Sequence, residues 1–170
     1  MPLVPILPFA RDAKKLSRDE FIAQHPDPVL MVNPFRSIHD TGFETKAADG
    51  SEHGSTITVA RIRKRPGSNA FAQMITIGRA GNNDIEIKGS GVSKFHAYLS
   101  RGPGGQVLIV DGGSTFGTLV GDHELVPRTD KVPLKSGDVI RFGDAVVATF
   151  HDPAGFYDCL LAASEWGRVE

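Results

Sequence analysis

Residues 96–120 read HAYLSRGPGGQVLIVDGGSTFGTLV. Three short runs in this stretch, 96–101, 106–110 and 117–120, are rich in β-branched, aromatic and aliphatic residues, which favours strands. Gly-Pro-Gly-Gly separates the first two runs and Asp-Gly-Gly follows the second, and both are typical turn sequences. Several short strands at this spacing predict a β-sandwich or a barrel.

The strand pattern extends to both sides of this stretch. From Thr56 onward, alternate residues such as Thr58, Ala60 and Ile62 follow the two-residue period of a half-buried strand. Pro-Gly and Gly-Asn-Asn supply further turns. We therefore expect additional strands at 56–64, 70–77, 84–87, 138–142 and 145–151, in an all-β domain that spans residues 56–151.

The region before this domain is expected to be an extension, residues 1–55. Prolines among apolar residues in 1–15 favour an extended arm. Ser17-Arg18-Asp19-Glu20 has the pattern of a capping box, which predicts a helix to about Gln24. The apolar run 29–32 suits a covering strand, and the polar, glycine-containing stretch 36–54 is typical of a linker.

The region after the domain, residues 152–170, is expected to be a closing helix and tail. Asp152 is a suitable cap, and Pro153 suits the first helical position. Phe156, Leu160 and Ala163 follow at spacings of four and three, so they share one face of the helix. We expect this face to pack against the rest of the chain in preference to a second subunit.

Composition limits the classes of function. Nineteen basic and twenty acidic residues give a net charge of -1, so no overall field attracts nucleic acid or an anionic membrane. The chain has a single cysteine, Cys159, which favours a reducing compartment and is expected to pack in the closing helix. No apolar run reaches the roughly 20 residues of a membrane helix. A cytoplasmic protein is expected.

Three turn segments carry the residues that suggest chemistry. Gly78-Arg79 follows one expected strand, Ser93-Lys94-Phe95-His96 precedes another, and Gly113 to Thr118 joins two more. Loops at one end of a sandwich converge, so a guanidinium, an ammonium and several hydroxyls can meet there. A phosphorylated hydroxyl carries about -1.5 to -2 charges and three acceptor oxygens, and a planar guanidinium can bind two of them. The pattern therefore favours a phosphate-binding site.

These segments, in their order and spacing, resemble the forkhead-associated (FHA) domain. Any one of them would be a weak signal alone, but six in succession make a specific one. The resemblance covers roughly residues 56–151. Its segments are Ile77-Gly78-Arg79, Asn83-Asp84-Ile85, Val92 to Ala97, Asp111 to Thr118, Leu134 to Ile140, and Phe142-Gly143.

The resemblance implies an FHA/SMAD-like β-sandwich of about eleven strands in two sheets, with short helices at both ends of the chain. It implies a module that binds a phosphothreonine-containing protein, such as a Ser/Thr protein kinase or its substrate, with no cofactor, no metal and no catalysis. The phosphate contacts implied are Arg79, Ser93, Lys94 and Thr115. Gly78, His96 and Gly117 are implied as structural support, and Asn82 and Asn83 as readers of adjacent side chains.

One residue departs from the pattern. Phe116 stands where the family usually has an asparagine that hydrogen-bonds the backbone of the bound peptide, and a phenyl ring cannot make those bonds. Phe116 instead offers an apolar surface to a partner side chain. A second hypothesis follows, in which the sandwich is a phosphate-independent adaptor or assembly subunit.

Other readings of the sequence have less support. Ser93 and His96 are close enough to suggest a hydrolase, but no Gly-x-Ser-x-Gly motif is present. The six histidines lack zinc-type spacing. The basic run 61–65 has no interleaved aromatic residues, so we interpret it as a solvated strand edge and not as a nucleic-acid site.

Overall fold

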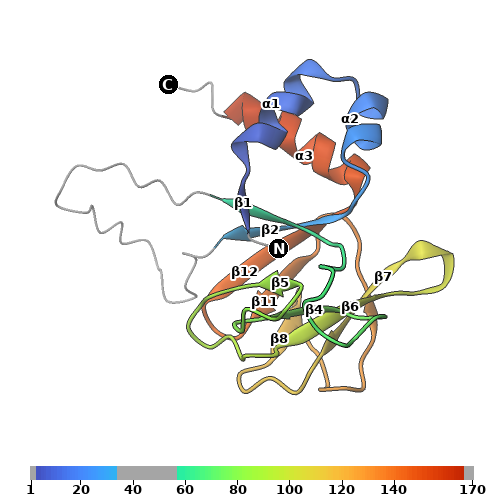
Figure 1. Cartoon of the computed structure of the whole chain (residues 1–170). Helices are drawn as coiled ribbons and strands as arrows, with labels where there is room; N and C mark the ends of the chain where they lie inside the picture. Colours follow the sequence, from blue (N-terminus) through green and yellow to red (C-terminus); the bar gives the residue numbers. More distant parts are fainter. Residues whose placement is uncertain (1–2, 34–56, 167–170) are drawn as a thin grey trace.

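The computed structural model describes residues 3–33 and 57–166, and these residues form two β-sheets and a group of three helices (Figure 1). The expected all-β sandwich is confirmed, with twelve strands. The first sheet has seven strands, in the order β1 (Val4–Pro5), β3 (Thr58–Arg61), β2 (Val29–Asn33), β12 (Val146–His151), β11 (Val139–Phe142), β8 (Thr118–Val120) and β9 (His123–Glu124). The second has five, in the order β10 (Val132–Pro133), β7 (Val107–Asp111), β6 (Ala97–Arg101), β4 (Ile75–Gly78) and β5 (Ile85–Glu86).

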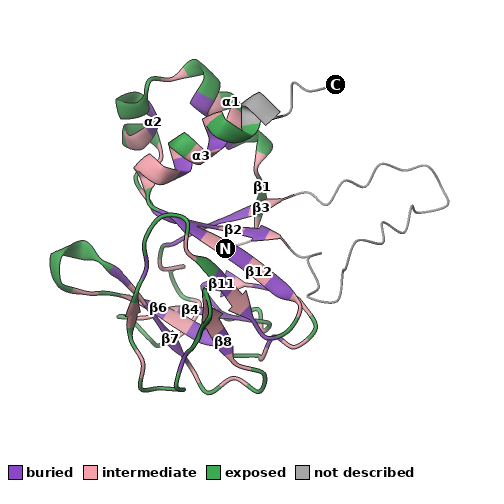
Figure 2. Ribbon diagram, turned by 180° about the vertical axis from the view of Figure 1, so that it is seen from behind, coloured by how far each residue is buried: buried purple, intermediate pink, exposed green. Residues whose placement is uncertain are grey.

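The core lies between the two sheets. Leu99 of β6 is opposite Ile109 of β7, and both are fully buried because alternate side chains of a strand point to the same face. Ile140, Phe142 and Ala148 form the matching buried face of the first sheet. Among the described residues, all strand pairs are antiparallel except β4 with β5. Figure 2 shows the buried residues along the strands of both sheets.

The expected strands match the observed ones best where the pattern is longest. Strands β6, β7, β8, β11 and β12 coincide with their expected ranges within one or two residues. Residues 70–74 were expected to be strand but form turns, because Asn69 and the backbone of Phe71 bond locally: the Phe71 amide donates to Asn69 Oδ1 at 3.1 Å. Strands β1, β9 and β10 have two residues each, too few for a periodic pattern.

The N-terminal segment differs from its expected extended arm. Only Val4–Pro5 are extended, as β1, and helix α1 follows at Leu7–Lys15. Pro8 lies in the first helical turn, where its missing amide costs nothing and its fixed φ suits the helix. The helix is stabilised by burial of one face, which includes Phe9 and Ala13. Pro8 therefore marks the start of a helix, whereas Pro5 lies in β1.

The second helix, α2 (Arg18–Gln24), has the expected capping box. The Glu20 amide donates to Ser17 Oγ at 3.3 Å, and the Ser17 amide donates to Glu20 Oε2 at 2.8 Å. Helix α3 (Pro153–Trp166) begins as expected, because the Gly155 amide donates to Asp152 Oδ1 at 2.7 Å. Both helices thus begin at residues whose side chains satisfy free backbone amides.

The three helices pack together at one end of the sandwich (Figure 1). Phe9, Phe21 and Phe156 form the centre of this group; the ring centroids of Phe9 and Phe156 are 5.4 Å apart, and those of Phe21 and Phe156 are 5.9 Å apart. Phe156 and Leu160 are buried, which confirms packing of α3 within the chain. Ala163 was expected on the same buried face but is exposed.

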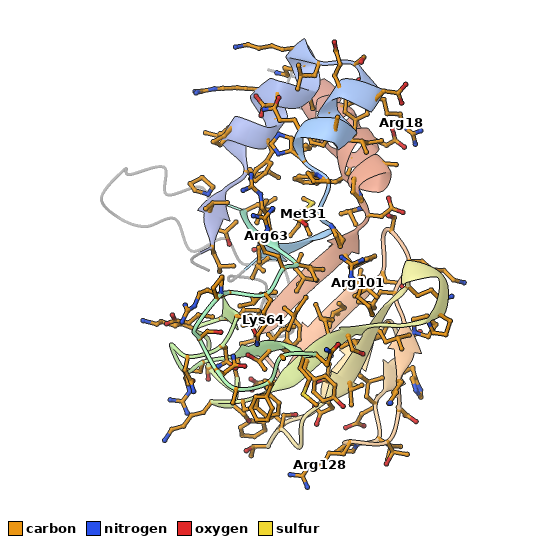
Figure 3. The ribbon with its side chains drawn as sticks, turned by 45° about the vertical axis from the view of Figure 1, so that its right-hand side comes forward. Arg18, Met31, Arg63, Lys64, Arg101 and Arg128 are labelled. Carbon is orange, nitrogen blue, oxygen red and sulfur yellow. The ribbon has the colours of Figure 1, made fainter. Side chains whose placement is uncertain are left out.

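The basic run 61–65 is not a solvated edge. Strand β3 has β1 on one side and β2 on the other, so it is an interior strand of the sheet. Figure 3 shows Arg63 and Lys64 against the body of the molecule. The four basic side chains have separate partners: Arg61 lies over the ring of Phe9, Arg63 pairs with Asp27, Lys64 pairs with Asp84, and Arg65 donates to the Gly81 carbonyl.

The expected linker at 36–54 lies outside the described residues. Strands β1 and β2, from the N-terminal region, are part of the seven-stranded sheet, so the sheet extends beyond residues 56–151. The division of the chain at residues 55 and 151 stays a prediction. Within the described parts of the chain, no helix is long and apolar enough to cross a membrane.

Replacing Phe156 tests whether the helices and the sandwich unfold together. Phe156 is fully buried between α1 and α2, so Phe156→Ala should lower the free energy of unfolding by about 3–5 kcal/mol. Urea denaturation followed by circular dichroism measures this change. Leu7→Ala is the control, since Leu7 is exposed and its loss should change stability by less than about 0.5 kcal/mol. Equal midpoints for wild type and Phe156→Ala would contradict this packing.

Candidate functional site

Three loops meet at the end of the sandwich away from the helices: residues 79–84 after β4, 87–96 before β6, and 112–117 between β7 and β8 (Figure 1). Hydrogen bonds join them. The Arg79 amide donates to the Ser93 carbonyl at 2.9 Å, and the Thr115 amide donates to Ser93 Oγ at 3.1 Å. Residues that are far apart in the sequence, 79, 93 and 115, are therefore neighbours.

These loops enclose an open hollow of about 340 Å³, which we name the anion hollow. Its lining includes three of the expected phosphate contacts, Arg79, Ser93 and Thr115. Lys94 is exposed on the same loop as Ser93 but is not part of the lining. The other lining residues are Gly89, Ser90, Gly91, Val92 and Phe116. The segment 89–91 was not expected in the site, and its glycines bring backbone close to the hollow.

One nitrogen of the Arg79 guanidinium is hydrogen-bonded within the protein, and the other two are free to bind a ligand. Its Nε donates to the Val92 carbonyl at 3.1 Å, which fixes the direction of the guanidinium. Its two terminal Nη groups have no partner among residues 3–33 and 57–163. A guanidinium oriented in this way presents its outer donors to the hollow with little loss of side-chain entropy on binding.

His96 is completely buried and joins two of the loops. Its Nδ1 accepts a hydrogen bond from the Ser93 amide at 3.1 Å, so the proton is on Nε2, which donates to the Gly117 carbonyl at 2.9 Å. Burial lowers the pKa of His96 below its ordinary value, although the bond to Gly117 and the charge of Asp111 raise it. The neutral ring is therefore the form that fits this position.

These two bonds also test the hypothesis that Ser93 and His96 form the catalytic pair of a hydrolase. Both ring nitrogens are occupied by backbone groups, and Ser93 Oγ accepts from the Thr115 amide. Neither nitrogen of His96 is therefore available to take the proton from Ser93 Oγ. The arrangement lacks the bond between nucleophile and base that such catalysis requires.

Asp111 organises the loop 112–117, although it was not among the expected site residues. Its Oδ1 accepts from the amides of Gly113 and Ser114, at 2.8 and 2.9 Å. Its Oδ2 accepts from the hydroxyls of Ser114 and Thr118, both at 2.6 Å. Burial would raise the pKa of Asp111, but these hydrogen bonds outweigh burial, so the pKa lies below its ordinary value. The sequence Asp111-Gly-Gly-Ser, an acidic residue before a turn, is the signal that could have identified Asp111 as the organiser of this loop.

A second buried carboxylate, Asp84, holds the other side of the site. Its oxygens accept from Lys64 Nζ at 2.9 Å, from the Arg65 amide at 2.8 Å and from the Thr76 amide at 2.9 Å. Burial would raise the pKa of Asp84, but the bonds from Lys64 and the backbone amides hold it well below its ordinary value. Sequence pattern alone does not reveal this network, because its members are spread over residues 64–84.

Two glycines have positions that a side chain would not allow. A Cβ at Gly78 would collide with the Lys94 carbonyl, so the strand β4 and the Ser93 loop can approach only without one. Gly117 has a φ of 87°, in the left-handed region that glycine adopts freely. Its carbonyl accepts from both His96 Nε2 and the Gly143 amide.

The two asparagines of the first loop have different positions. Asn82 is exposed. Asn83 is buried, and its Nδ2 donates to the carbonyls of Ala80 and Lys94 at 2.8 and 2.7 Å. Asn83 was expected to contact the partner, but its amide nitrogen is already used to join two loops, so the structure gives it a supporting position.

Phe116 is at the rim of the anion hollow and is 61% exposed. The residues on both sides are held: the Thr115 amide bonds Ser93, and the Gly117 amide bonds Ser114 Oγ at 3.0 Å. The ring is thus presented to solvent by an ordered backbone. An exposed aromatic ring beside a polar hollow is typical of a surface that contacts a partner.

Fold and site together define a β-sandwich domain with an open hollow built from loops at one end. The model of the FHA domain family matches residues 75–143, which include all three loops. The matched residues therefore have the sandwich fold of an FHA domain.

Solved structures of other FHA domains resemble the chain. The solution structure of the FHA domain of an Arabidopsis thaliana hypothetical protein is 24% identical, with a TM-score of 0.51 over 74% of this chain and 85% of that chain. This likeness supports the sandwich fold. Mycobacterium tuberculosis EmbR in complex with a low-affinity phosphopeptide is 31% identical over 47% of this chain and 20% of that chain, with a TM-score of 0.41. No curated protein sequence matches the chain.

Buried neutral His96 predicts a loss of stability in mild acid. Because its folded-state pKa is lowered, the unfolded chain takes up the proton first as the pH falls. The free energy of unfolding should therefore be constant above about pH 7 and decrease as the pH falls below about 6.5. Urea denaturation from pH 7.5 to pH 5 measures this decrease.

His96→Gln and His151→Gln separate the two contributions to this pH dependence. Burial also lowers the pKa of His151, which lies at the end of β12. Each variant should remove part of the decrease below pH 6.5. An identical decrease in wild type and His96→Gln would show that His96 is not the titrating group.

Proposed function

We propose that this chain is a phosphothreonine-dependent protein-binding module that recruits a phosphorylated partner in Ser/Thr kinase signalling. The observation that carries the proposal is the meeting of the oriented Arg79 guanidinium, the Ser93 hydroxyl and Thr115 around one hollow. Binding without turnover is part of the proposal, because His96 is engaged at both nitrogens.

The chemistry of the hollow suits a phosphate monoester. Such a group has three acceptor oxygens and about -1.5 to -2 charges at neutral pH. The free Nη groups of Arg79 can donate to two of these oxygens. Ser93 Oγ accepts from Thr115, which leaves the Ser93 hydroxyl hydrogen to donate to the phosphate. Lys94, exposed on the same loop, adds a second positive charge.

The proposed partner is a protein that carries phosphothreonine, either a Ser/Thr kinase or a kinase substrate. One solved FHA structure with 22% identity concerns phosphothreonine-dependent interactions, and another contains FhaA with the intracellular domain of Rv3910. The proposal includes neither nucleic acid nor a membrane as partner. A cytoplasmic location, expected from the single cysteine, is part of the same proposal.

A phosphate-independent adaptor is the second candidate function. The exposed ring of Phe116 favours it, because an apolar residue at the rim of the hollow provides affinity that does not require phosphate. Pull-downs from lysate before and after phosphatase treatment discriminate the two functions. Loss of the partners after treatment supports the phosphothreonine module, and retention of every partner supports the adaptor.

Arg79→Ala should abolish most of the phosphopeptide affinity. It removes two charge-assisted hydrogen bonds, each worth about 1.5–3 kcal/mol, so binding should weaken by about 100-fold or more. Calorimetric titration with a degenerate phosphothreonine peptide library measures the affinity. Arg101→Ala is the matched control, because Arg101 is an exposed arginine at the opposite end of β6. Equal binding by wild type and Arg79→Ala would refute the proposal.

Phe116→Asn should strengthen binding of the same library. An asparagine at the rim supplies one donor and one acceptor for the peptide backbone, each bond worth about 0.5–1.5 kcal/mol, so affinity should rise by about tenfold. Phe116→Ala serves as the comparison, since it removes the ring without adding an amide. If Phe116→Asn binds no better than Phe116→Ala, residue 116 does not contact the peptide backbone.

A further inference from the structure

Residues 89–92 form a tight turn beside the anion hollow. The Val92 amide donates to the Gly89 carbonyl at 3.2 Å, and Gly91 has a φ of 81°. A positive φ at the third residue is typical of a type II turn. Ser90 is the second residue of this turn, so it lies at the tip. Its side chain is exposed and lines the hollow together with Arg79.

The two glycines beside Ser90 seat the turn on the sandwich. A Cβ at Gly89 would collide with the side chain of Val146, and a Cβ at Gly91 would collide with the carboxylate of Asp144. The backbone on both sides of Ser90 can therefore lie close to the sheet only because it has no side chains. This fit fixes the place of Ser90 at the edge of the hollow.

The Ser90 hydroxyl takes no part in the hydrogen bonds that hold the site. It has no partner among residues 3–33 and 57–163. The other two serines of these loops are half-buried and in use: Ser93 Oγ accepts from the Thr115 amide, and Ser114 Oγ accepts from the Gly117 amide. Ser90 is thus the exposed serine of the site whose hydroxyl is available for covalent modification.

The charges around Ser90 favour an anion. Arg79, with two free Nη groups, is the charged residue in the lining of the hollow, and Lys94 is exposed on the adjoining loop. Lys88 precedes the turn, is 80% exposed and pairs with Glu86 at 3.2 Å. Asp144 lies against Gly91 but is not part of the lining. A phosphate on Ser90 would therefore face a guanidinium across the hollow.

Such a phosphate would compete directly with a phosphorylated partner. It carries three acceptor oxygens and about -1.5 to -2 charges, which the guanidinium of Arg79 can bind in pairs. A group attached to the same chain acts at an effective concentration in the millimolar range. A second phosphate would then find Arg79 occupied and would be repelled by like charge. One modification of Ser90 thus suffices to close the hollow to other phosphates.

We propose that Ser90 is a phosphoacceptor for a Ser/Thr protein kinase and that its phosphate occupies the anion hollow, which prevents the phosphothreonine partner from binding. This proposal rests on the proposed function above and adds an off switch to it. The kinase transfers the γ-phosphoryl group of ATP: a P–O bond forms to Ser90 Oγ, the bond to ADP breaks, and the hydroxyl proton goes to the catalytic base of the kinase. Hydrolysis by a phosphatase restores the serine.

The effect on binding is tested with phosphoserine incorporated at position 90 during synthesis. Calorimetric titration with the phosphothreonine peptide library should show about 100-fold weaker binding than by the unmodified chain. Ser90→Glu should weaken binding by about tenfold, and by at least fivefold relative to Ser90→Gln, which has nearly the same shape without the charge. Gln106→Glu is the control for added charge, because Gln106 is exposed on the hairpin at the far end of β6 and β7.

The place of the phosphate is tested by phosphorus NMR without any partner. The second pKa of a phosphoserine is ordinarily about 6, and a paired guanidinium lowers it because it stabilises the dianion. In the chain with phosphoserine at 90, the phosphate should titrate about half a unit or more below its value in the same chain with Arg79→Ala. Arg101→Ala should leave the titration unchanged. Identical titrations with and without Arg79 would overturn occupancy of the hollow.

Mass mapping tests whether a kinase reaches Ser90. The chain is incubated with ATP and a Ser/Thr kinase that prefers basic residues before the acceptor, chosen because Lys88 precedes Ser90 by two residues. Trypsin should release residues 89–94 with one phosphate, and fragmentation should place it on Ser90 and not on Ser93. Ser90→Ala should yield this peptide without phosphate. An unmodified peptide from wild type would overturn Ser90 as a phosphoacceptor.

The outcomes separate this proposal from the one on which it rests. If the phosphoserine chain and the unmodified chain bind the library equally, or if Ser90→Glu and Ser90→Gln bind equally, the off switch is overturned and the phosphothreonine module stands. If the unmodified chain binds no phosphothreonine peptide, the proposed function is overturned and the off switch with it. The NMR titration reports contact between Arg79 and the phosphate in either case.

Discussion

The two hydrogen bonds of buried His96 hold together the loops at the end of the sandwich away from the helices. One links the ring to the Ser93 amide and the other to the Gly117 carbonyl, so the loop before β6 and the loop before β8 have a common support. Ser93 in turn bonds Thr115 and the Arg79 amide. The position of the Ser93 loop, which bonds Thr115 and the Arg79 backbone, therefore depends on one neutral imidazole, which is costly to protonate because it is fully buried.

Two buried carboxylates complete this support from either side. Asp111 binds the amides and hydroxyls of the loop 112–117, and Asp84 binds the segment that leads from β3 to β4. Each takes several donors, which offsets the cost of removing a charge from water. The polar interior of this end contrasts with the opposite end, where three helices bury phenylalanine rings. Apolar burial thus stabilises the helical end, whereas hydrogen bonds fix the positions of the loops at the other end.

Exposed aromatic rings surround the proposed phosphate site. Phe116 places a ring at the rim of the anion hollow, and Phe71 and Phe95 place two more beside the adjacent loops. All three rings are exposed. Figure 3 shows that Arg128 also points outward at this end, with its guanidinium near Gly113. Charge and aromatic surface are therefore combined around the proposed phosphate contacts.

The sequence by itself determined the sandwich, the order of its longer strands, and the caps of α2 and α3, because strand periodicity and capping are properties of neighbouring residues. It also indicated Arg79, Ser93 and Thr115 as residues of one site. Only the tertiary structure decided that Asn83 is a support, that Lys64 is paired with Asp84, and that residues 7–15 form a helix. The contact between the rings of Phe71 and Phe95 was likewise decided by the tertiary structure. These outcomes depend on contacts between segments distant in the sequence, where burial and hydrogen bonding outweigh the local preference of each residue.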